Sequence, residues 1–143
     1  MDEHAEPAGG ELLALLHTAY VAQAAVESKL DAIGLSMAKL LALRALLDAG
    51  GELPLGQLAE RLSCVKSNVT QLVDRLAAAG LVARKPDPDD RRTRLAALTA
   101  EGRKACKEGI RVQQQAERTV LAGLSPRERR QLDGLLHKVA AAG

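Results

Sequence analysis

The sequence predicts a mainly α-helical protein with one small β-hairpin, and three observations support this fold class. Leu, Ala and Val must fill the interior, because 47% of the 143 residues are apolar but none is Phe or Trp, and Tyr20 is the single aromatic residue. Leu and Ala are strong helix formers. Apolar residues recur at spacings of three and four over most of the chain. A stretch rich in Pro and Asp, residues 86–90, predicts a tight turn between two strands.

In the N-terminal half, apolar periodicity predicts helices whose ends are marked by capping residues and glycines. Ser36 is a suitable N-cap, because its hydroxyl can accept a hydrogen bond from the first helical turn. Gly34, Gly50 and Gly80 directly follow periodic stretches, as glycines at helix C-termini do. The elements expected in this half are a loose arm at 1–10, helices at 11–33, 37–49, 55–62 and 66–79, a short extended segment at 52–54 that can join a small sheet, and a tight turn at 63–65.

In the C-terminal half, the turn and the cap residues define the remaining elements. The turn holds two prolines and three aspartates. Thr99 is a suitable N-cap for a long helix. Ser125 and Glu128 form a capping box around Pro126, which suits the first helical position. The elements expected in this half are strands at 81–85 and 94–99 around the turn at 86–90, a helix at 100–121 and a last helix that begins at 126.

Charge is distributed unevenly along the chain, although the net charge is only +2. Residues 1–54 carry 3 basic and 8 acidic side chains, whereas residues 55–107 carry 11 basic and 6 acidic ones. The basic excess coincides with the two short helices and the hairpin, as binding to phosphates would require. A solvated surface without a partner is the alternative. The acidic N-terminus lacks an apolar signal core, and no stretch reaches the ~20 apolar residues of a membrane span, so we expect a cytoplasmic protein with no membrane contact.

The exposed face expected for the helix at 66–79 consists of side chains suited to reading base edges. Short polar groups replace the Glu and Lys usual on surface helices, despite their low helix propensity. Asn and Gln can pair bidentately with adenine, whereas an Arg one turn later suits a phosphate. An ordinary amphipathic surface helix is the alternative. The candidate DNA-contacting residues of this helix are Lys66, Ser67, Asn68, Thr70, Gln71 and Arg75.

The hairpin provides a second set of candidate contacts. An Arg on a thin loop can enter the minor groove, where the potential is most negative over A·T-rich sequence, and a neighbouring Asp can hold its guanidinium in a fork geometry. A helix that follows a turn, beside such a hairpin, can occupy one groove of a duplex while the hairpin touches another. A solvated charged turn is the alternative. The candidate residues of the hairpin are Asp90, Arg91, Arg92 and Arg94.

A set of motifs extends from the first short helix to the start of the long one. They are Leu58-Ala-Glu-Arg-Leu62, Ser67-Asn-Val-Thr-Gln-Leu-Val-Asp-Arg-Leu76, Gly80-Leu-Val82, Asp87-Pro-Asp-Asp-Arg-Arg92, Leu98-Thr99 and Gly102. Together they resemble the MarR family of winged helix-turn-helix transcriptional regulators. The resemblance is close over about residues 36–105.

The resemblance implies a sequence-specific regulator of transcription, most often a repressor, that binds double-stranded DNA as a homodimer on a pseudo-palindromic operator. The helix at 66–79 would lie in the major groove, and Arg92, braced by Asp90, in the minor groove. We therefore expect a DNA-binding winged helix-turn-helix domain at 36–99 and a helical dimerisation region formed by 11–35 and 100–143. Long Leu/Ala stripes in the terminal helices independently favour a dimer.

The resemblance also implies a signal that releases DNA, because members often bind a small aromatic or phenolic effector between the dimer core and the winged domain. The candidate crevice residues are His17, Tyr20, Gln23, Met37 and Arg44. The alternative places Tyr20 in the core and His17 at the surface. Cys64 is a candidate redox site, since a nearby cation lowers a thiol pKa; an idle cysteine is the alternative. Cys106 is expected in the core.

Several function classes are not expected. The three histidines have no ligand spacing, so the sequence predicts no metal site, and it indicates no cofactor. An enzyme is not expected either, because no nucleophile–base pair, paired carboxylates or Gly-rich phosphate loop occurs at a workable spacing. The remaining alternative is a winged-helix module that contacts proteins without binding DNA.

Overall fold

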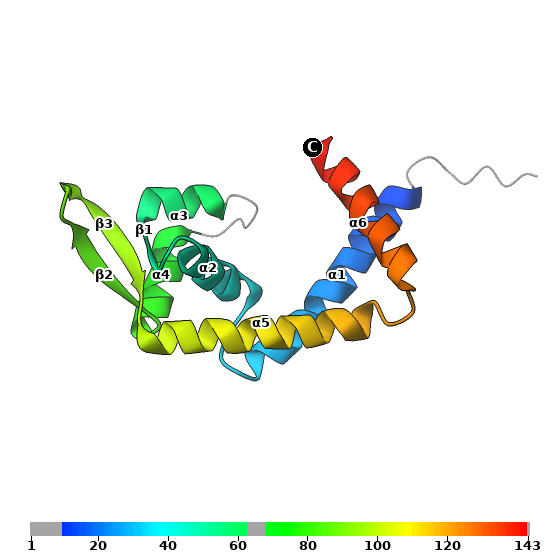
Figure 1. Ribbon diagram of the computed structural model, residues 1–143, viewed down its shortest axis with the longest axis horizontal. Coiled ribbons are helices and arrows are strands. Elements are labelled where there is room, and N and C mark those ends of the chain that lie inside the picture. Colours follow the sequence, from blue (N-terminus) through cyan, green and yellow to red (C-terminus); the bar gives the residue numbers. More distant parts are fainter. Residues whose placement is uncertain (1–9, 63–67, 143) are drawn as a thin grey trace, which may run out of the picture.

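The computed structural model describes residues 10–62 and 68–142, which form six helices and one small sheet in an elongated molecule (Figure 1). It confirms the predicted fold class. Within the described part of the chain, no helix combines the length and the apolar character needed to cross a membrane. The elements are α1 (Gly10–Asp31), α2 (Met37–Asp48), β1 (Glu52–Pro54), α3 (Leu55–Arg61), α4 (Val69–Ala78), β2 (Val82–Asp87), β3 (Asp90–Leu98), α5 (Ala100–Val120) and α6 (Pro126–Ala141).

Local side-chain bonds explain why several helices begin where the sequence predicts. The hydroxyl of Ser36 accepts a hydrogen bond from the backbone N–H of Lys39 at 3.1 Å. Thr99 Oγ1 caps α5 in the same way, and the capping box of Ser125 and Glu128 is complete at the start of α6. These caps satisfy backbone donors that the first helical turn leaves without partners.

The sheet is antiparallel, with β3 between β1 and β2. The segment at 52–54 forms β1, as expected. The strands β2 and β3 extend much further toward the tip of the hairpin than the predicted 81–85 and 94–99, so the expected wide turn is wrong. The turn is confined to Pro88 and Asp89, and the carboxylate of Asp87 accepts a hydrogen bond from the N–H of Asp89 at 2.9 Å. Side-chain bonding of this kind closes a tight turn with few residues.

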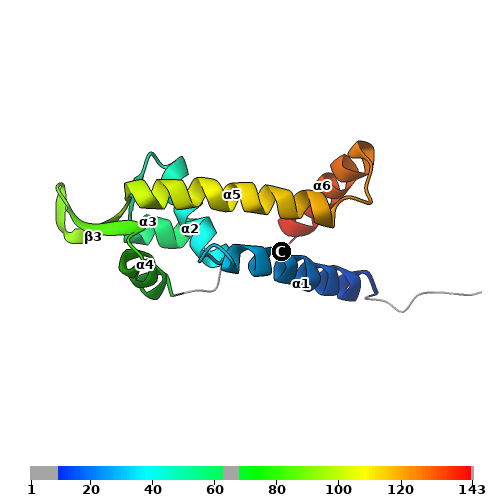
Figure 2. The same ribbon diagram turned by 90° about the horizontal axis from the view of Figure 1, so that it is seen from below.

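The part of the chain from α2 to β3, here called the winged domain, is held together by leucine packing. Figure 2 shows α5 along one side of this domain and α4 on the opposite side. Cys106 of α5 is fully buried, as expected, and burial raises the pKa of its thiol while the nearby Arg44 opposes that rise. The fully buried leucines and valine of this core are Leu40, Leu43 and Leu46 of α2, Leu58 of α3, and Val73 and Leu76 of α4.

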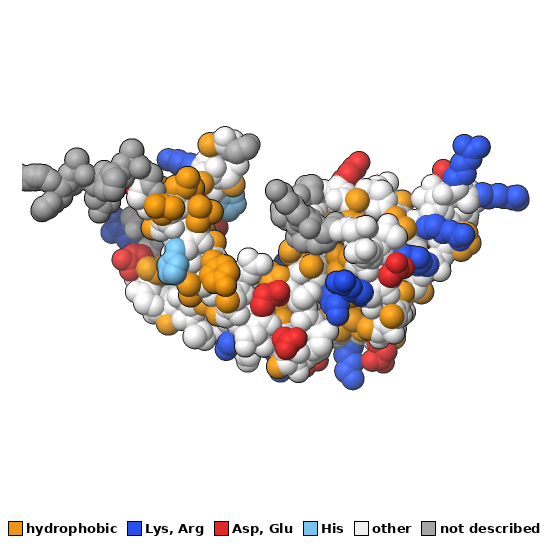
Figure 3. Space-filling view, turned by 180° about the vertical axis from the view of Figure 1, so that it is seen from behind, with side chains coloured by type: hydrophobic (Ala, Val, Ile, Leu, Met, Phe, Trp, Pro, Cys, Tyr) orange, Lys and Arg blue, Asp and Glu red, His pale blue; other side chains and the backbone are white. Residues whose placement is uncertain are grey.

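The other end of the molecule, here called the helical lobe, consists of α1, α6 and the second half of α5, and it has almost no core. α6 has no buried residue. Figure 3 shows apolar side chains gathered on the surface of this lobe. Tyr20 is 73% exposed, so the alternative that placed it in the core of the protomer is wrong. The large apolar side chains left exposed within the described residues are Leu12, Leu13, Leu16, Tyr20 and Val21 of α1, Val120 of α5, and Leu135, Leu136 and Val139 of α6.

Two glycines allow α5 to approach the winged domain closely. A Cβ at Gly102 would overlap the backbone carbonyl oxygen of Leu81, and one at Gly109 would lie 2.7 Å from Leu40 Cδ1. Both glycines are buried. The absence of a side chain at these positions therefore sets the distance between α5 and the rest of the domain.

We expect Gly102→Ala to lower the free energy of unfolding by about 3 kcal/mol, because the new methyl group would push against rigid backbone. Gly56→Ala, also in a helix but with open space around its Cβ, is the matched control and should be neutral or slightly stabilising. Urea unfolding at one fixed protein concentration measures both. Equal stability of the two variants would contradict the close approach.

Candidate nucleic-acid interface

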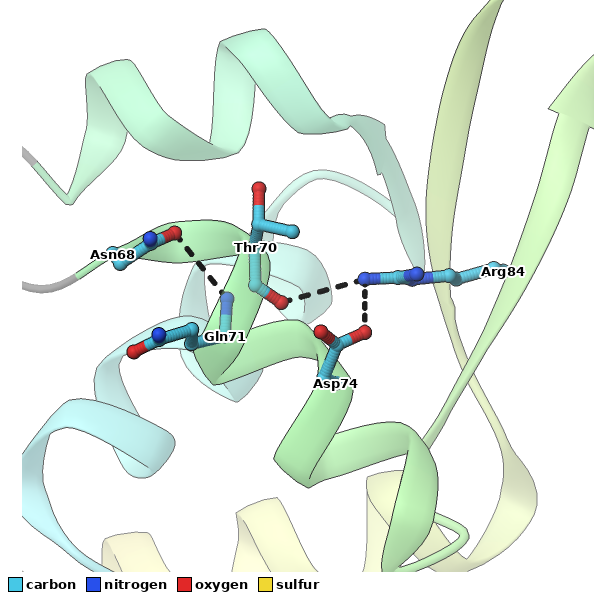
Figure 4. Close-up of polar contacts among 5 residues, drawn as sticks. All are labelled: Asn68, Thr70, Gln71, Asp74 and Arg84. Atoms are coloured by element: carbon cyan, nitrogen blue, oxygen red, sulfur yellow. Dashed lines mark hydrogen bonds and ion pairs between the residues drawn. The ribbon is translucent and has the colours of Figure 1, made fainter.

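The helix α4 begins at Val69, three residues later than predicted, because Asn68 serves as its N-cap. Asn68 Oδ1 accepts a hydrogen bond from the backbone N–H of Gln71 at 3.3 Å (Figure 4). Asn is among the best capping residues. The carboxamide oxygen of Asn68 is thus engaged by the helix, and its amino group is left to donate. Lys66, Ser67 and Cys64 lie outside the described residues.

The two faces of α4 differ in character as the sequence predicts. Leu72, Val73 and Leu76 are buried against the rest of the winged domain. The opposite face is exposed and carries Thr70, Gln71, Asp74 and Arg75. This face offers hydroxyl, amide and guanidinium groups at a surface that a nucleic acid could reach.

Arg84, which the sequence analysis did not single out, joins the hairpin to this face. It projects from β2 and makes an ion pair with Asp74, and its Nη2 also donates a hydrogen bond to the carbonyl oxygen of Thr70 at 3.4 Å (Figure 4). Asp74 is the single acidic residue of α4. The pair therefore neutralises the negative charge on the exposed face and fixes the hairpin relative to the helix.

The hairpin places its arginines on a strand rather than on a loop. Arg91, Arg92 and Arg94 are exposed residues of β3. The resemblance implied that Asp90 braces the guanidinium of Arg92, but the structure shows a different role. Asp90 Oδ1 accepts a hydrogen bond from the backbone N–H of Arg92 at 3.0 Å, and Asp90 Oδ2 accepts one from Thr93 Oγ1 at 2.9 Å. An Asp at a turn commonly bonds the backbone two residues on. Asp90 consequently shapes the start of β3, and the arginine side chains extend from it.

The candidate crevice residues are only partly brought together. Tyr20 and Gln23 line a cavity of about 230 Å³ on α1, with Glu27. Arg44 lies elsewhere: its Nη1 donates to Gln113 Oε1 at 3.2 Å, and it lines a different cavity of about 410 Å³. His17 is exposed and lines neither of these two cavities.

Met37, another candidate crevice residue, connects α2 to α1 through its backbone. Its N–H donates a hydrogen bond to Glu27 Oε1, so that a side chain of α1 binds the first turn of α2. In the described part of the chain, no group of three or more His, Cys, Asp or Glu side chains is arranged to hold a metal ion.

Comparisons with known proteins agree with this architecture. A family model described as the MarR family matches residues 33–93. The HTH-type transcriptional regulator YkoM of Bacillus subtilis (strain 168) is 36% identical over 93 residues, which are 65% of this chain and 60% of YkoM. The HTH-type transcriptional repressor Rv2887 of Mycobacterium tuberculosis (strain ATCC 25618 / H37Rv) is 30% identical over 116 residues, which are 81% of this chain and 83% of the repressor.

Among solved structures, one similar protein is BpsR of Bordetella bronchiseptica, whose structure concerns the regulation of its DNA binding by 6-hydroxynicotinic acid. The TM-score is 0.76 at 28% identity, and the match covers 88% of this chain and 95% of that chain. The likeness thus extends over the winged domain and the helical lobe together.

Asp74→Ala should weaken binding to a DNA duplex by about tenfold, which corresponds to ~1.4 kcal/mol. Loss of an acidic group from a DNA-facing surface would by itself strengthen binding, so a weaker complex identifies Asp74 as a residue that positions Arg84 and the hairpin. Fluorescence anisotropy measures the affinity. Asp89→Ala, which removes the same charge at the hairpin turn, is the control and should bind at least as tightly as the unmodified protein.

Proposed function

The chain belongs to the MarR family of transcriptional regulators, and we propose that it represses transcription by binding double-stranded DNA as a homodimer on a pseudo-palindromic operator. The observation that carries this proposal is the exposed polar face of α4, joined through Asp74 and Arg84 to a hairpin with three exposed arginines. The contacts of Arg84 join helix and hairpin, and both elements present donors, as a surface that spans neighbouring grooves requires.

In this proposal α4 enters the major groove and the hairpin reaches the minor groove. Thr70 and Gln71, in the first turn of α4, are the proposed base-reading residues, together with the amino group of Asn68. Arg75, one turn later, is the proposed phosphate contact. Arg92 is the proposed minor-groove residue, flanked by Arg91 and Arg94. Lys66 and Ser67, which precede Asn68 in the sequence, complete the set of proposed DNA contacts.

The proposed homodimer rests on the helical lobe. Nine large apolar side chains are exposed on this lobe within the described residues, and clusters of exposed apolar side chains commonly mark protein–protein interfaces. A hollow of about 590 Å³ lies between α5 and α6, with Leu121, Leu132 and Leu136 among its lining residues. The ion pair between Arg129 and Glu117, at 3.3 Å, links the two helices beside it. A second copy, related by a two-fold axis, would cover both surfaces at once and present two copies of α4 to one duplex.

The proposed signal is a small aromatic molecule that lowers the affinity for DNA. Support comes from the similar structure of BpsR, whose DNA binding is described as regulated by 6-hydroxynicotinic acid. On this chain, the cavity of Tyr20 and Gln23 offers one ring and one amide for such a ligand. Oxidation of Cys64 is a second proposed signal. The proposed repression follows the 30% identical relative that is named a repressor, and a regulator that binds DNA would act in the cytoplasm.

Arg92→Ala should weaken binding to the duplex that flanks the protein's own gene by tenfold or more, because a cation in the minor groove gains most from its negative potential.

Gln71→Ala should instead change the ranking of duplex sequences, with the salt dependence unaltered. Gel shifts at several salt concentrations separate the two effects. If the unmodified protein bound no duplex, the DNA-binding role would be wrong, and a protein-contacting winged helix would replace it.

Leu135→Asp should convert the dimer into monomers, because it places a charge on the apolar face of α6. Sedimentation velocity measures the mass, and circular dichroism shows whether the helices persist. His137→Asp adds a charge to the opposite side of the same helix, so we expect it to leave the dimer intact. A dimer that survived Leu135→Asp would exclude α6 from the interface.

A further inference from the structure

A second concave surface lies beside α4, on the side away from the hairpin. It is a cavity of about 270 Å³ between α2 and α4. Its polar lining consists of the two N-cap residues Ser36 and Asn68, Lys39 of α2, and Gln71 and Arg75 of α4. Figure 4 shows Asn68 and Gln71 directed to the opposite side of α4 from Arg84. Ser36 and Lys39 are not among the DNA contacts predicted from the sequence.

Every polar side chain that lines this cavity can donate a hydrogen bond. Lys39 and Arg75 are positively charged and have no acceptor atoms. Ser36 Oγ accepts from the N–H of Lys39, and Asn68 Oδ1 accepts from the N–H of Gln71, so the Ser36 hydroxyl hydrogen and the Asn68 amino group are left to donate. Among the residues that the structure describes, no carboxylate lines the cavity. Two cations with several neutral donors are the chemistry that recognises the oxygens of a phosphate group.

We propose that this cavity binds one phosphate of the DNA backbone, held jointly by Lys39 and Arg75. The inference rests on the proposed DNA-binding function. A helix that lies in the major groove has phosphates of the two strands on its two sides. Arg84 and the hairpin occupy one side of α4, and the cavity occupies the other. The phosphate contact therefore sets how far α4 can slide or roll in the groove, and it makes α2 part of the interface.

The test is the affinity of the variants Lys39→Gln and Arg75→Gln for several duplexes of about 30 base pairs, measured at about 0.05 to 0.2 M KCl. Each substitution removes one phosphate contact per subunit, so the slope of log K against log salt should become shallower by about two per dimer. Affinity at ~0.1 M salt should fall more than tenfold for every sequence alike. Because both side chains hold one phosphate, the double variant should lose less than the product of the two single losses.

Lys107→Gln, on the exposed face of α5, is the matched control for the change in charge and should bind like the unmodified protein. If Lys39→Gln also did so while the unmodified protein bound DNA, the cavity would have no part in binding, and the proposed function would stand without it. A sequence-dependent loss would assign Lys39 to a base and overturn the proposal.

Inorganic phosphate is the other source of the same chemistry, and a titration followed by NMR distinguishes it. If the unmodified protein bound phosphate through Lys39 but no duplex, a site for free phosphate would replace the proposed backbone contact. If it bound neither, both the cavity proposal and the proposed function would fail.

Discussion

The close approach of α5 to the winged domain is the constraint on which the rest of the structure depends. The carbonyl oxygen of Leu81 lies against Gly102 and also accepts a hydrogen bond from the N–H of Thr99 at 3.2 Å. The hydroxyl of Thr99 donates to the carbonyl oxygen of Gly80 at 2.6 Å. These two hydrogen bonds join the turn between α4 and β2 to the N-terminus of α5. Without aromatic side chains to fill a wider gap, backbone contact at a glycine holds the long helix in place.

This anchoring gives the two ends of the molecule different tasks. In the winged domain, leucine packing and the pair of Asp74 and Arg84 fix a polar, basic surface in one shape. In the helical lobe, apolar side chains of comparable size remain exposed, and in the proposed dimer the second copy covers them. Exposed ion pairs contribute little to the free energy of unfolding. The pair of Asp74 and Arg84 matters because it orients the hairpin relative to α4.

Features that depend on a few neighbouring residues could be predicted from the sequence. The caps at Ser36, Thr99 and Ser125 are of this kind, because each bond joins residues three positions apart. The buried face of α4 also follows from its period. Asn68 shows the limit of this reasoning, since a carboxamide oxygen can accept a hydrogen bond from a base or from the first turn of a helix. Only the backbone geometry shows that the oxygen of Asn68 caps α4.

Features that depend on distant residues could not be predicted. The pairing of β2 with β3 continues past charged residues that read as a loop, and Arg84 meets Asp74 from a different element. A stripe of apolar residues in the sequence does not indicate whether the same chain covers it in the fold. For this reason the sequence was compatible with a buried Tyr20, whereas the structure leaves this side chain exposed. The contact between Glu27 and the first turn of α2 has a mechanical consequence of the same non-local kind. In the proposed dimer, this hydrogen bond would couple a tilt of α1 to α2, and a ligand beside Tyr20, Gln23 and Glu27 would thereby change the distance between the two α4 helices.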